Sequence, residues 1–302
     1  MAVYSISDLE KLSGIKAHTL RIWEQRYVLI EPKRTQTNIR YYTDDDLKTI
    51  LNVSVLNKNG YKISKIAAMS PAERSLKVST LSEKSFEQET QLDALTISMI
   101  EMDEFKFDRI ISINIQQLGF ERTMIDVIHP LLDKLGLLWL TGSIHPVQEN
   151  FMSYLIRQKI IVAIDKLPLP LIKNTKKFLL YLPEGENQEL SLLFMHYLLK
   201  SRGYQVIYIG QNMSLDDLRD VNGIHKPDFI FTIITESFTR HSIAKYLDQI
   251  SECFEDAKIL VSGYQVVVQK FVPNANTVIL KNLQETSTYL EILGAENEPN
   301  SN

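Results

Sequence analysis

The N-terminal part of the chain alternates short amphipathic segments with polar turns. Apolar residues recur at a helical spacing from Ser5, which can cap a helix, to Gly14, which can end it. Residues Ala17 to Tyr27 repeat this spacing, with Leu20 and Trp23 on the inward side. Two short helices joined by a tight turn form a helix-turn-helix, whose second helix is sized for the major groove of DNA.

A polar and basic segment follows, from Pro32 to Tyr42. It has no helical period, and its C-terminal end alternates polar and apolar residues, which is typical of the hairpin (the wing) of a winged helix. Thr43 and the aspartates after it supply a cap and an acidic first turn, which predict a third helix from about Asp44 to Asn57. We expect this N-terminal domain to span residues 1–71.

Helical periodicity returns after a polar stretch. Residues 72–89 contain few large apolar side chains, and we interpret them as a linker or a loosely packed helix. Residues 90–168 then show amphipathic blocks separated by short connections, a pattern that predicts an antiparallel four-helix bundle. The blocks are Thr90–Met102, Asp103–Leu118, Phe120–Leu140 and Pro146–Leu167.

Strands and helices alternate over residues 175–294. Helical stretches such as Leu190–Ser201 and Arg240–Cys253 lie between apolar strand candidates, which indicates a doubly wound, parallel, five-stranded Rossmann-like sheet. We expect residues 295–302 to be a disordered tail, and the fold class to be multidomain α and α/β. The strand candidates are Phe178–Leu182, Val206–Ile209, Phe229–Ile234, Ile259–Val261 and Thr277–Leu280.

The composition is that of an ordinary globular protein, with 44% hydrophobic and 23% charged residues. No apolar run approaches the ~18 residues that span a bilayer, and the N-terminus lacks the pattern of a signal peptide. We therefore expect a cytoplasmic protein with no membrane partner. The single cysteine, Cys253, excludes an internal disulfide framework and a cysteine-based zinc cluster.

Charge is unevenly distributed along the chain. Residues 1–75 carry 12 Lys+Arg and 8 Asp+Glu, whereas the remaining residues carry 21 and 29. A small basic module attached to a larger acidic body indicates a polyanion-binding head.

The residues of this head resemble those of a known family. The segments Tyr4–Ile6, Ser13–Ile15, Thr19–Tyr27, Pro32–Arg34 and Asn38–Tyr42 are similar to the winged helix-turn-helix of MerR regulators, at that family's spacing. The resemblance runs from Val3 to about Met69. The Thr-Leu-Arg-x-Trp-Glu-x-Arg-Tyr variant most resembles the branch that includes the light- and cobalamin-responsive repressors CarH and LitR.

The resemblance implies double-stranded DNA as the partner and gives each polar residue of the head a role. Basic side chains neutralise phosphates, the first turn of the recognition helix meets base edges, and the wing adds neutral hydrogen bonds. Two alternatives stay open: His18 as an exposed residue without a base contact, and one wing tyrosine as part of the core. The expected contacts are Arg21, Arg26, Lys33, Arg34 and Arg40 for phosphates, His18 and Thr19 for bases, and Asn38, Tyr41 and Tyr42 in the wing.

The helical block that ends at Leu140 and the block that follows it resemble the cap of cobalamin-binding modules. In the photoreceptor branch this cap supplies a Trp above the cobalt and a Glu-His pair ten and eleven residues later. This chain has Trp139 and Glu149, but Asn150 stands at the His position. Trp139 is equally well interpreted as an aromatic of the bundle core.

The first strand-helix loop of the C-terminal segment resembles the cobalamin-binding Glu/Asp-x-His-x-x-Gly motif. The acid is Glu186, but Gln188 stands where the family has the lower cobalt ligand, and Ser191 replaces the Gly. An amide is a poor substitute for an imidazole nitrogen on cobalt. We therefore expect the fold without His-ligated cobalamin, in a pocket that is empty, filled by side chains or adapted to another effector. Two further family motifs correspond to Thr232 and to Ser262-Gly263.

The sequence thus predicts a one-component transcriptional regulator. We expect it to bind a palindromic operator as a dimer or tetramer, with the C-terminal module controlling assembly or receiving a small-molecule or protein signal. The alternative is a functional cobalamin-dependent, light-sensing repressor. A third interpretation, an enzyme, is disfavoured because the sequence shows no Ser/His/Asp or Cys/His constellation.

Overall fold

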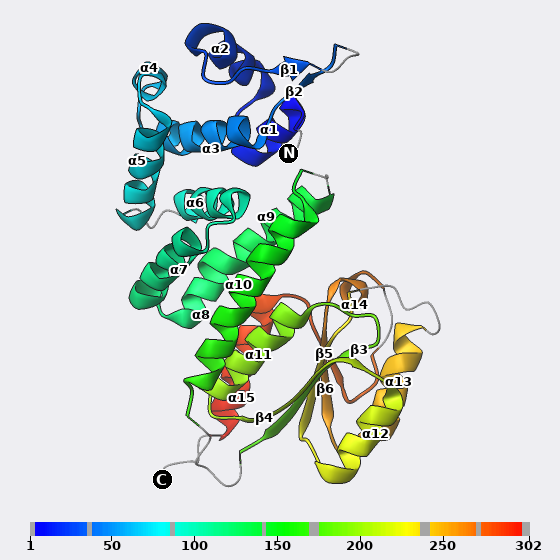
Figure 1. Cartoon of the computed structure of the whole chain (residues 1–302). Coiled ribbons are helices and arrows are strands. Elements are labelled where there is room, and N and C mark those ends of the chain that lie inside the picture. Colours follow the sequence, from blue (N-terminus) through cyan, green and yellow to red (C-terminus); the bar gives the residue numbers. More distant parts are fainter. Residues whose placement is uncertain are drawn as a thin grey trace. The chain divides into compact units, whose positions relative to one another are not determined.

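The chain forms two compact units, residues 1–156 and 157–302. The computed structural model describes residues 4–34, 38–84, 88–140, 143–168, 175–235, 242–269 and 273–297 (Figure 1). The boundary between the units falls within α10 (Pro146–Asp165). Within these described ranges, no helix combines the length and the apolar character needed to cross a membrane.

The N-terminal unit begins with the predicted winged helix-turn-helix. Apolar positions bury one side of each helix, and a short antiparallel hairpin follows the second helix. The predicted second helix has the expected bounds, and the third ends one residue later than expected. The elements are α1 (Ile6–Ser13), α2 (Ala17–Tyr27), β1 (Lys33–Arg34), β2 (Arg40–Tyr41), α3 (Asp44–Lys58) and α4 (Ile63–Ala67).

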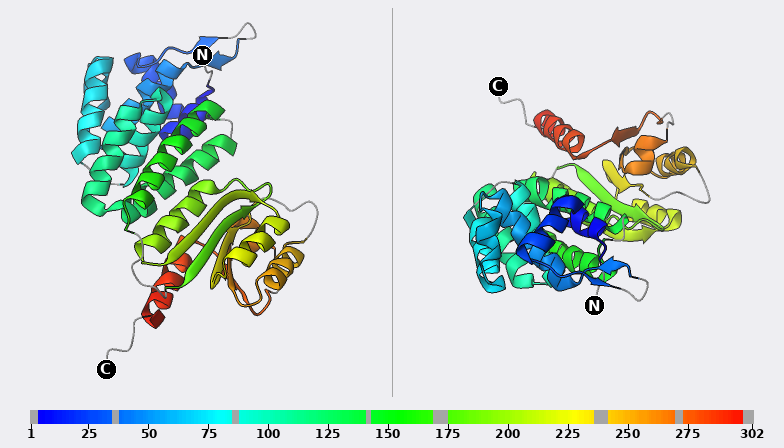
Figure 2. Two further views of the ribbon diagram at one scale, coloured as in Figure 1. Left: turned by 60° about the horizontal axis from the view of Figure 1, so that its bottom comes forward. Right: turned by 90° about the horizontal axis from the view of Figure 1, so that it is seen from above.

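Helices make up the rest of the N-terminal unit, and the four predicted blocks are confirmed. The blue-to-green helices in Figure 2 pack side by side. The segment that we interpreted as a linker or a loosely packed helix is helical up to Lys84, and this helix packs against α3 and α6. These helices, in addition to α10, are α5 (Pro71–Lys84), α6 (Gln88–Glu101), α7 (Glu104–Leu118), α8 (Phe120–Thr123) and α9 (His129–Leu140), with a π-helical turn at Met124–Ile128.

Helix α6 occupies the centre of the N-terminal unit. It packs against α3 and α5 on one side and against α7 and α9 on the other. Between Thr90 and Ile100 only Leu92 is even partly exposed. The polar residues Gln91 and Asp93 are therefore buried, and they need partners from the surrounding helices.

The C-terminal unit is a five-stranded parallel sheet in the order β4-β3-β5-β6-β7. This is the 2-1-3-4-5 order of doubly wound folds, so the predicted Rossmann-like sheet is confirmed. Figures 1 and 2 show helices on both faces, α11 and α15 on one and α12 and α13 on the other. The elements are β3 (Lys177–Pro183), α11 (Glu189–Ser201), β4 (Gln205–Met213), α12 (Leu215–Ile224), β5 (Phe229–Ile233), α13 (Ile243–Cys253), β6 (Lys258–Ser262), α14 (Tyr264–Val268), β7 (Thr277–Leu280) and α15 (Leu283–Asn297).

The central strands are apolar on both faces because both faces are covered. Leu179 and Tyr181 of β3 belong to a core cluster with Leu247 and Ile250 of α13. The alternate residues of β3 point to the other face, and Phe178 there contacts the rings of Tyr204 and Phe229. The expected disordered tail lies mostly outside the described residues, which end at residue 297.

Candidate nucleic-acid interface and C-terminal sheet edge

The turn between α1 and α2 is fixed by local hydrogen bonds. Gly14 ends α1 in the left-handed conformation, with a φ of 71° and its N–H donating to Glu10 O. Glu10 reaches across the turn, where its carboxylate accepts from the Ala17 N–H (3.1 Å) and pairs with Lys16 (3.1 Å). Lys16 and the Ala17 N–H hold the pKa of Glu10 below its ordinary value. The first turn of α2 is therefore held by α1.

The recognition helix α2 separates a buried side from an exposed side. Leu20 and Trp23 are buried, as predicted. His18, Arg21 and Arg26 are exposed, whereas Thr19 is partly exposed and its hydroxyl lies 3.3 Å from His18 Nε2. The expected base- and phosphate-contacting residues of α2 thus share the solvent side of one helix.

Two further side chains lie on this side, and the sequence analysis did not name them. Ile22 is 51% exposed, and Gln25 is exposed as well. They follow His18 by four and seven residues, so the helical period alone places them on the same face. Ile22 offers an apolar surface of the kind that contacts thymine methyl groups, and Gln25 offers an amide that can read adenine.

The wing presents cations from two paired strands. Lys33 pairs with Tyr41 and Arg34 with Arg40 in the β1-β2 register. Lys33 and Arg34 are exposed, and the Arg34 guanidinium donates to Asn38 Oδ1 (2.8 Å) and Asn38 O (3.2 Å). Asn38 adopts a φ of 65°, so it serves as the turn residue that orients Arg34. Residues 35–37 at the tip lie outside the described residues.

The remaining wing residues connect to the recognition helix through Glu24. Arg40 Nη1 lies 3.8 Å from Glu24 Oε1, and the Tyr42 hydroxyl donates to Glu24 Oε2 (3.1 Å). Tyr42 is fully buried, and burial, followed by Glu24, raises its pKa to about 12. Tyr42 is therefore a core residue, and we remove it from the expected DNA contacts. Tyr41, which is partly exposed, remains in that set.

At the C-terminal edge of the sheet, the acidic residue of the expected cobalamin-binding loop, Glu186, is buried. Glu186 follows β3 and is 3% exposed. Its Oε1 accepts from the Thr235 N–H (2.8 Å), just after β5. Since β3 and β5 are the first and third strands of a 2-1-3-4-5 sheet, Glu186 lies at the switch point where such folds bind ligands. Here the carboxylate connects the two loops.

The residues after Glu186 lead into α11. Gln188 is the N-cap residue and is partly exposed, but its side chain makes no capping hydrogen bond. Ser191 lies one turn into the helix and is exposed. Glu189 pairs with Arg157 of α10. The position expected for a metal ligand thus presents an amide.

Polar side chains are buried below this edge. Thr232, paired with Tyr181 in the sheet register, is fully buried. The Tyr181 hydroxyl lies 3.0 Å from that of Tyr246, and burial raises the pKa of both phenols. Beyond them, Ser262 ends β6 and Gly263 has a φ of 114°.

The packing at the end of β6 by itself requires a glycine at position 263. A Cβ at this position would lie 2.3 Å from the Ile234 carbonyl oxygen. The Ile234 N–H also donates to Ser262 O (2.8 Å). The glycine is therefore required by the close approach of two strand ends, whether or not a ligand is bound.

The cap residues of the expected pocket lie in the N-terminal unit. Glu149 Oε1 accepts from the Ser153 hydroxyl (3.0 Å), and Asn150 is exposed on α10. Trp139 belongs to α9, but its side chain lies outside the described residues, so its two interpretations stay open. Among the described side chains, no group of three or more His, Cys, Asp or Glu could hold a metal ion.

Comparison with known proteins agrees with this architecture. Residues 4–73 match the MerR HTH family regulatory protein model. The chain is 25% identical to the HTH-type transcriptional repressor CarH of Myxococcus xanthus over 233 residues, 75% of this chain and 77% of that protein. It is 25% identical to the repressor CarA of the same organism over 276 residues, 87% of this chain and 85% of that protein.

A solved structure also resembles the chain. The monomethylamine corrinoid protein of Methanosarcina barkeri matches 72% of this chain and 96% of its own, at 11% identity and a TM-score of 0.48.

Proposed function

We propose that this MerR-type DNA-binding regulator is a cytoplasmic, homo-oligomeric transcription factor that binds a two-fold symmetric operator and whose C-terminal unit controls assembly. The observation that carries the proposal is the exposed cationic surface of the head. Arg21 and Arg26 of α2 are exposed together with Lys33 and Arg34 of the wing, while the opposite side of α2 is core. The similarity to the repressors CarH and CarA supports a regulator and not an enzyme.

The surface explains both affinity and the need for two copies. Each basic side chain that neutralises a phosphate releases a counterion. The association constant therefore falls as salt is added, and each contact makes the slope of its logarithm against the logarithm of the salt concentration steeper by about 0.9. A single short recognition helix reads few base pairs. Two heads on one operator double the base contacts, so assembly of the chain is a natural point of control.

The test is selection of bound duplexes from a random pool, followed by fluorescence anisotropy on the recovered site. We expect a recovered sequence with two-fold symmetry and a negative salt slope with a magnitude of about 9, from about 0.9 for each of five basic residues in each of two heads. Absence of binding to any duplex in dilute buffer would refute the proposal.

We further propose that the C-terminal unit functions without His-ligated cobalamin. Gln188 and Asn150 stand at the two histidine positions that the family resemblance implies, and an amide does not match the cobalt affinity of an imidazole. A small-molecule or protein effector at the C-terminal edge of the sheet remains part of the proposal.

A functional cobalamin-dependent repressor is the second candidate, favoured by the position of Glu186 at the ligand-binding edge of the sheet. One experiment distinguishes this candidate from a C-terminal unit without cobalamin. The protein is incubated with adenosylcobalamin in the dark and desalted, and its visible spectrum is recorded. We expect a colourless wild type and a coloured Gln188→His/Asn150→His variant. A light-sensitive chromophore retained by the wild type would favour the second candidate.

A further inference from the structure

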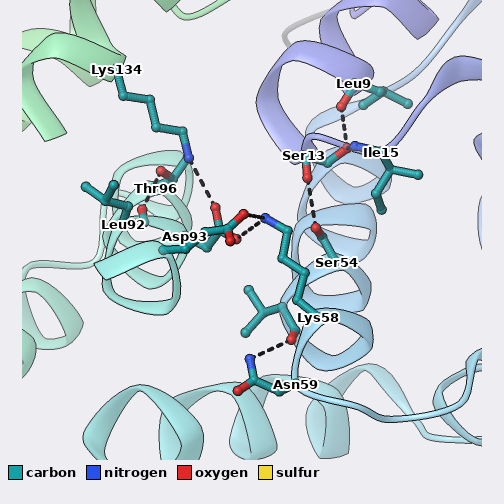
Figure 3. A network of polar contacts seen from close by, with 12 residues as sticks. Leu9, Ser13, Ile15, Ser54, Lys58, Asn59, Leu92, Asp93, Thr96 and Lys134 are labelled. Carbon is teal, nitrogen blue, oxygen red and sulfur yellow. Dashed lines mark hydrogen bonds and ion pairs between the residues drawn. The ribbon is translucent and has the colours of Figure 1, made fainter. Parts of the chain in front are cut away.

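A buried aspartate on α6 joins the DNA-binding head to the helical bundle. The Asp93 side chain is 7% exposed and accepts two ion pairs. Lys58 Nζ, at the end of α3, lies 2.7 Å from its Oδ2, and Lys134 Nζ, from α9, lies 3.2 Å from its Oδ1 (Figure 3). One carboxylate therefore connects three helices that are far apart in sequence.

The Lys58 ammonium is held firmly on this carboxylate. It also lies 2.7 Å from Glu89 Oε1, so two anions of α6 face it. Burial alone would lower the pKa of Lys58, but the hydrogen bonds to Asp93 and Glu89 place it above its ordinary value. Lys58 is thus charged, and the position of its ammonium is set by two acceptors.

The contact continues to the turn that precedes the recognition helix. The ammonium of Lys58 lies beside Gly14, 3.9 Å from where a Cβ would be. One turn earlier on α3, the buried Ser54 hydroxyl donates to Ser13 O (2.8 Å). Ser13 Oγ in turn accepts from the Ile15 N–H (3.2 Å), as Figure 3 shows. Displacement of α3 relative to α6 would therefore displace the start of α2.

A second attachment lies at the other end of α1. The Ser143 hydroxyl, just before α10, donates to Asp8 Oδ1 (3.2 Å), and the Tyr4 and His145 rings meet edge to face at 6.3 Å. Two separated attachments fix the orientation of a small domain, whereas one would act as a hinge. Of the two, the Asp93 attachment is the one in which two lysines pair with one carboxylate.

We infer that Asp93 is a positioning residue for DNA recognition, which holds the recognition helix in a fixed orientation on the bundle through Lys58. This inference rests on the proposed function. Its consequence concerns the distance between operator half-sites. In an oligomer assembled through its other parts, a rigid head accepts a narrow range of half-site spacings, whereas a loosened head accepts many.

The test compares spacing selectivity in the full-length protein. Duplexes carry two recovered half-sites separated by spacers altered in single steps up to half a helical turn, about 5 base pairs. We expect the wild type to prefer the matched spacing by about 100-fold, the lower range of the gain from simultaneous engagement. Asp93→Asn, which keeps the shape and removes the charge, should reduce this preference to less than about 10-fold, and Asp93→Glu should restore part of it.

Two controls separate positioning from stability. Lys106 of α7 is similarly shielded, and its ion pairs with Glu101 and Asp103 lie within the bundle. Lys106→Met should lower the melting temperature without changing spacing selectivity. Affinity for a duplex with one half-site should stay within about 3-fold in all variants, because no DNA-facing residue changes.

The outcomes are distinguishable. Failure of the wild type to bind any duplex would refute the proposed function itself. A wild type that binds but accepts all spacings would overturn the positioning role, as would full selectivity retained by folded Asp93→Asn. If Asp93→Asn does not fold, the same spacing assay is made with Lys58→Met, which leaves the Asp93–Lys134 pair intact. Reduced spacing selectivity in this variant would support the positioning role, and full selectivity would overturn it.

Discussion

In the DNA-binding head, the basic side chains expected to meet a ligand lie at the surface, whereas at the C-terminal edge of the sheet two of the expected ligand-site residues, Glu186 and Thr232, are buried. Arg21 and Arg34 of the head are exposed, and the partner of Arg34 is the wing's own Asn38. Glu186 is buried against the Thr235 N–H, and Thr232 lies in the core. One region retains the chemistry of its family, and the other retains mainly its packing.

The difference shows that a fold and its ligand chemistry can be maintained by separate constraints. The head needs exposed cations because its ligand is a polyanion, and nothing in the packing of α2 requires them. Gly263 at the sheet edge matches the cobalamin pattern, yet the Ile234 carbonyl alone accounts for it. Persistence of a motif residue is therefore weak evidence for a ligand when packing requires the same residue.

Gly263→Ala tests this packing explanation and should have the largest effect. The added Cβ would meet the Ile234 carbonyl, and the φ of 114° is strained for any side chain. Backbone strain together with overpacking should lower the free energy of unfolding of the C-terminal unit by about 2–5 kcal/mol. Urea denaturation followed by circular dichroism measures it.

Gly223→Ala is the matched control, because that glycine lies in α12 with nothing within 4 Å of an added Cβ. It should be neutral or stabilise the unit by up to about 1 kcal/mol. Binding of Gly263→Ala to a single half-site should be unchanged. Equal stabilities of the two variants would contradict the packing explanation.

The next largest effect is expected from the buried pair of phenols that fills the sheet edge. Tyr181→Phe removes the hydroxyl that lies 3.0 Å from Tyr246 and leaves the latter without this partner, at a cost of about 1–3 kcal/mol in unfolding free energy. The double variant with Tyr246→Phe should cost less than the two single changes together, because neither hydroxyl is then left behind. Additive losses in urea denaturation would show that the hydroxyls are not coupled.

Local patterns were sufficient to predict the elements of both units. The recognition helix Ala17–Tyr27 and the strand Thr277–Leu280 have the predicted bounds because caps, turns and apolar spacing act within a few residues. Such patterns also placed the cations of the head, but they could not decide which wing tyrosine is core. That choice depends on Glu24, which lies 18 residues away from Tyr42.

The burial of α6 could not be predicted for the same reason. The block was predicted only as amphipathic, and in the structure its polar residues Gln91 and Asp93 are buried. Their partners come from elsewhere in the chain: Asn114 donates to Gln91 Oε1 (3.0 Å), and the lysines of α3 and α9 pair with Asp93. Periodicity reports the environment of one helix, but not which distant groups satisfy its polar side chains.

Arg40→Ala tests whether the exposed cations of the head contact phosphates, and its expected effect in free energy is smaller than those of the two preceding changes. On a duplex with one half-site, removal of one phosphate contact should weaken binding by up to about 10-fold and reduce the magnitude of the salt slope by about 1. The fold should change little, because Arg40 lies as far as 3.8 Å from Glu24, and Glu24 keeps its hydrogen bond from Tyr42. Arg122→Ala, an exposed cation on α8, is the control, and it should leave the slope unchanged. An unchanged slope in Arg40→Ala would remove Arg40 from the phosphate contacts.

The smallest expected effect concerns a histidine of the C-terminal unit that has no role in DNA binding. His196 of α11 stacks on Tyr208 of β4, with ring centroids 5.4 Å apart. Burial, and then Lys200, lowers its pKa to about 4. The unfolded chain, with a histidine pKa of about 6.5, therefore binds a proton first as pH falls, and the folded unit loses stability between about pH 6.5 and pH 4.

Because His196 is partly exposed, the loss attributable to it should be on the order of 1 kcal/mol. His196→Phe keeps a stacked ring without a titrating group, so its stability should fall less than that of the wild type between pH 7 and pH 5. Urea denaturation at the two pH values measures the difference, with His225→Gln, an exposed histidine of the same unit, as the control. Identical pH dependence in wild type and His196→Phe would mean that α11 opens enough to protonate His196, and the sheet edge would then be less tightly filled than its packing indicates.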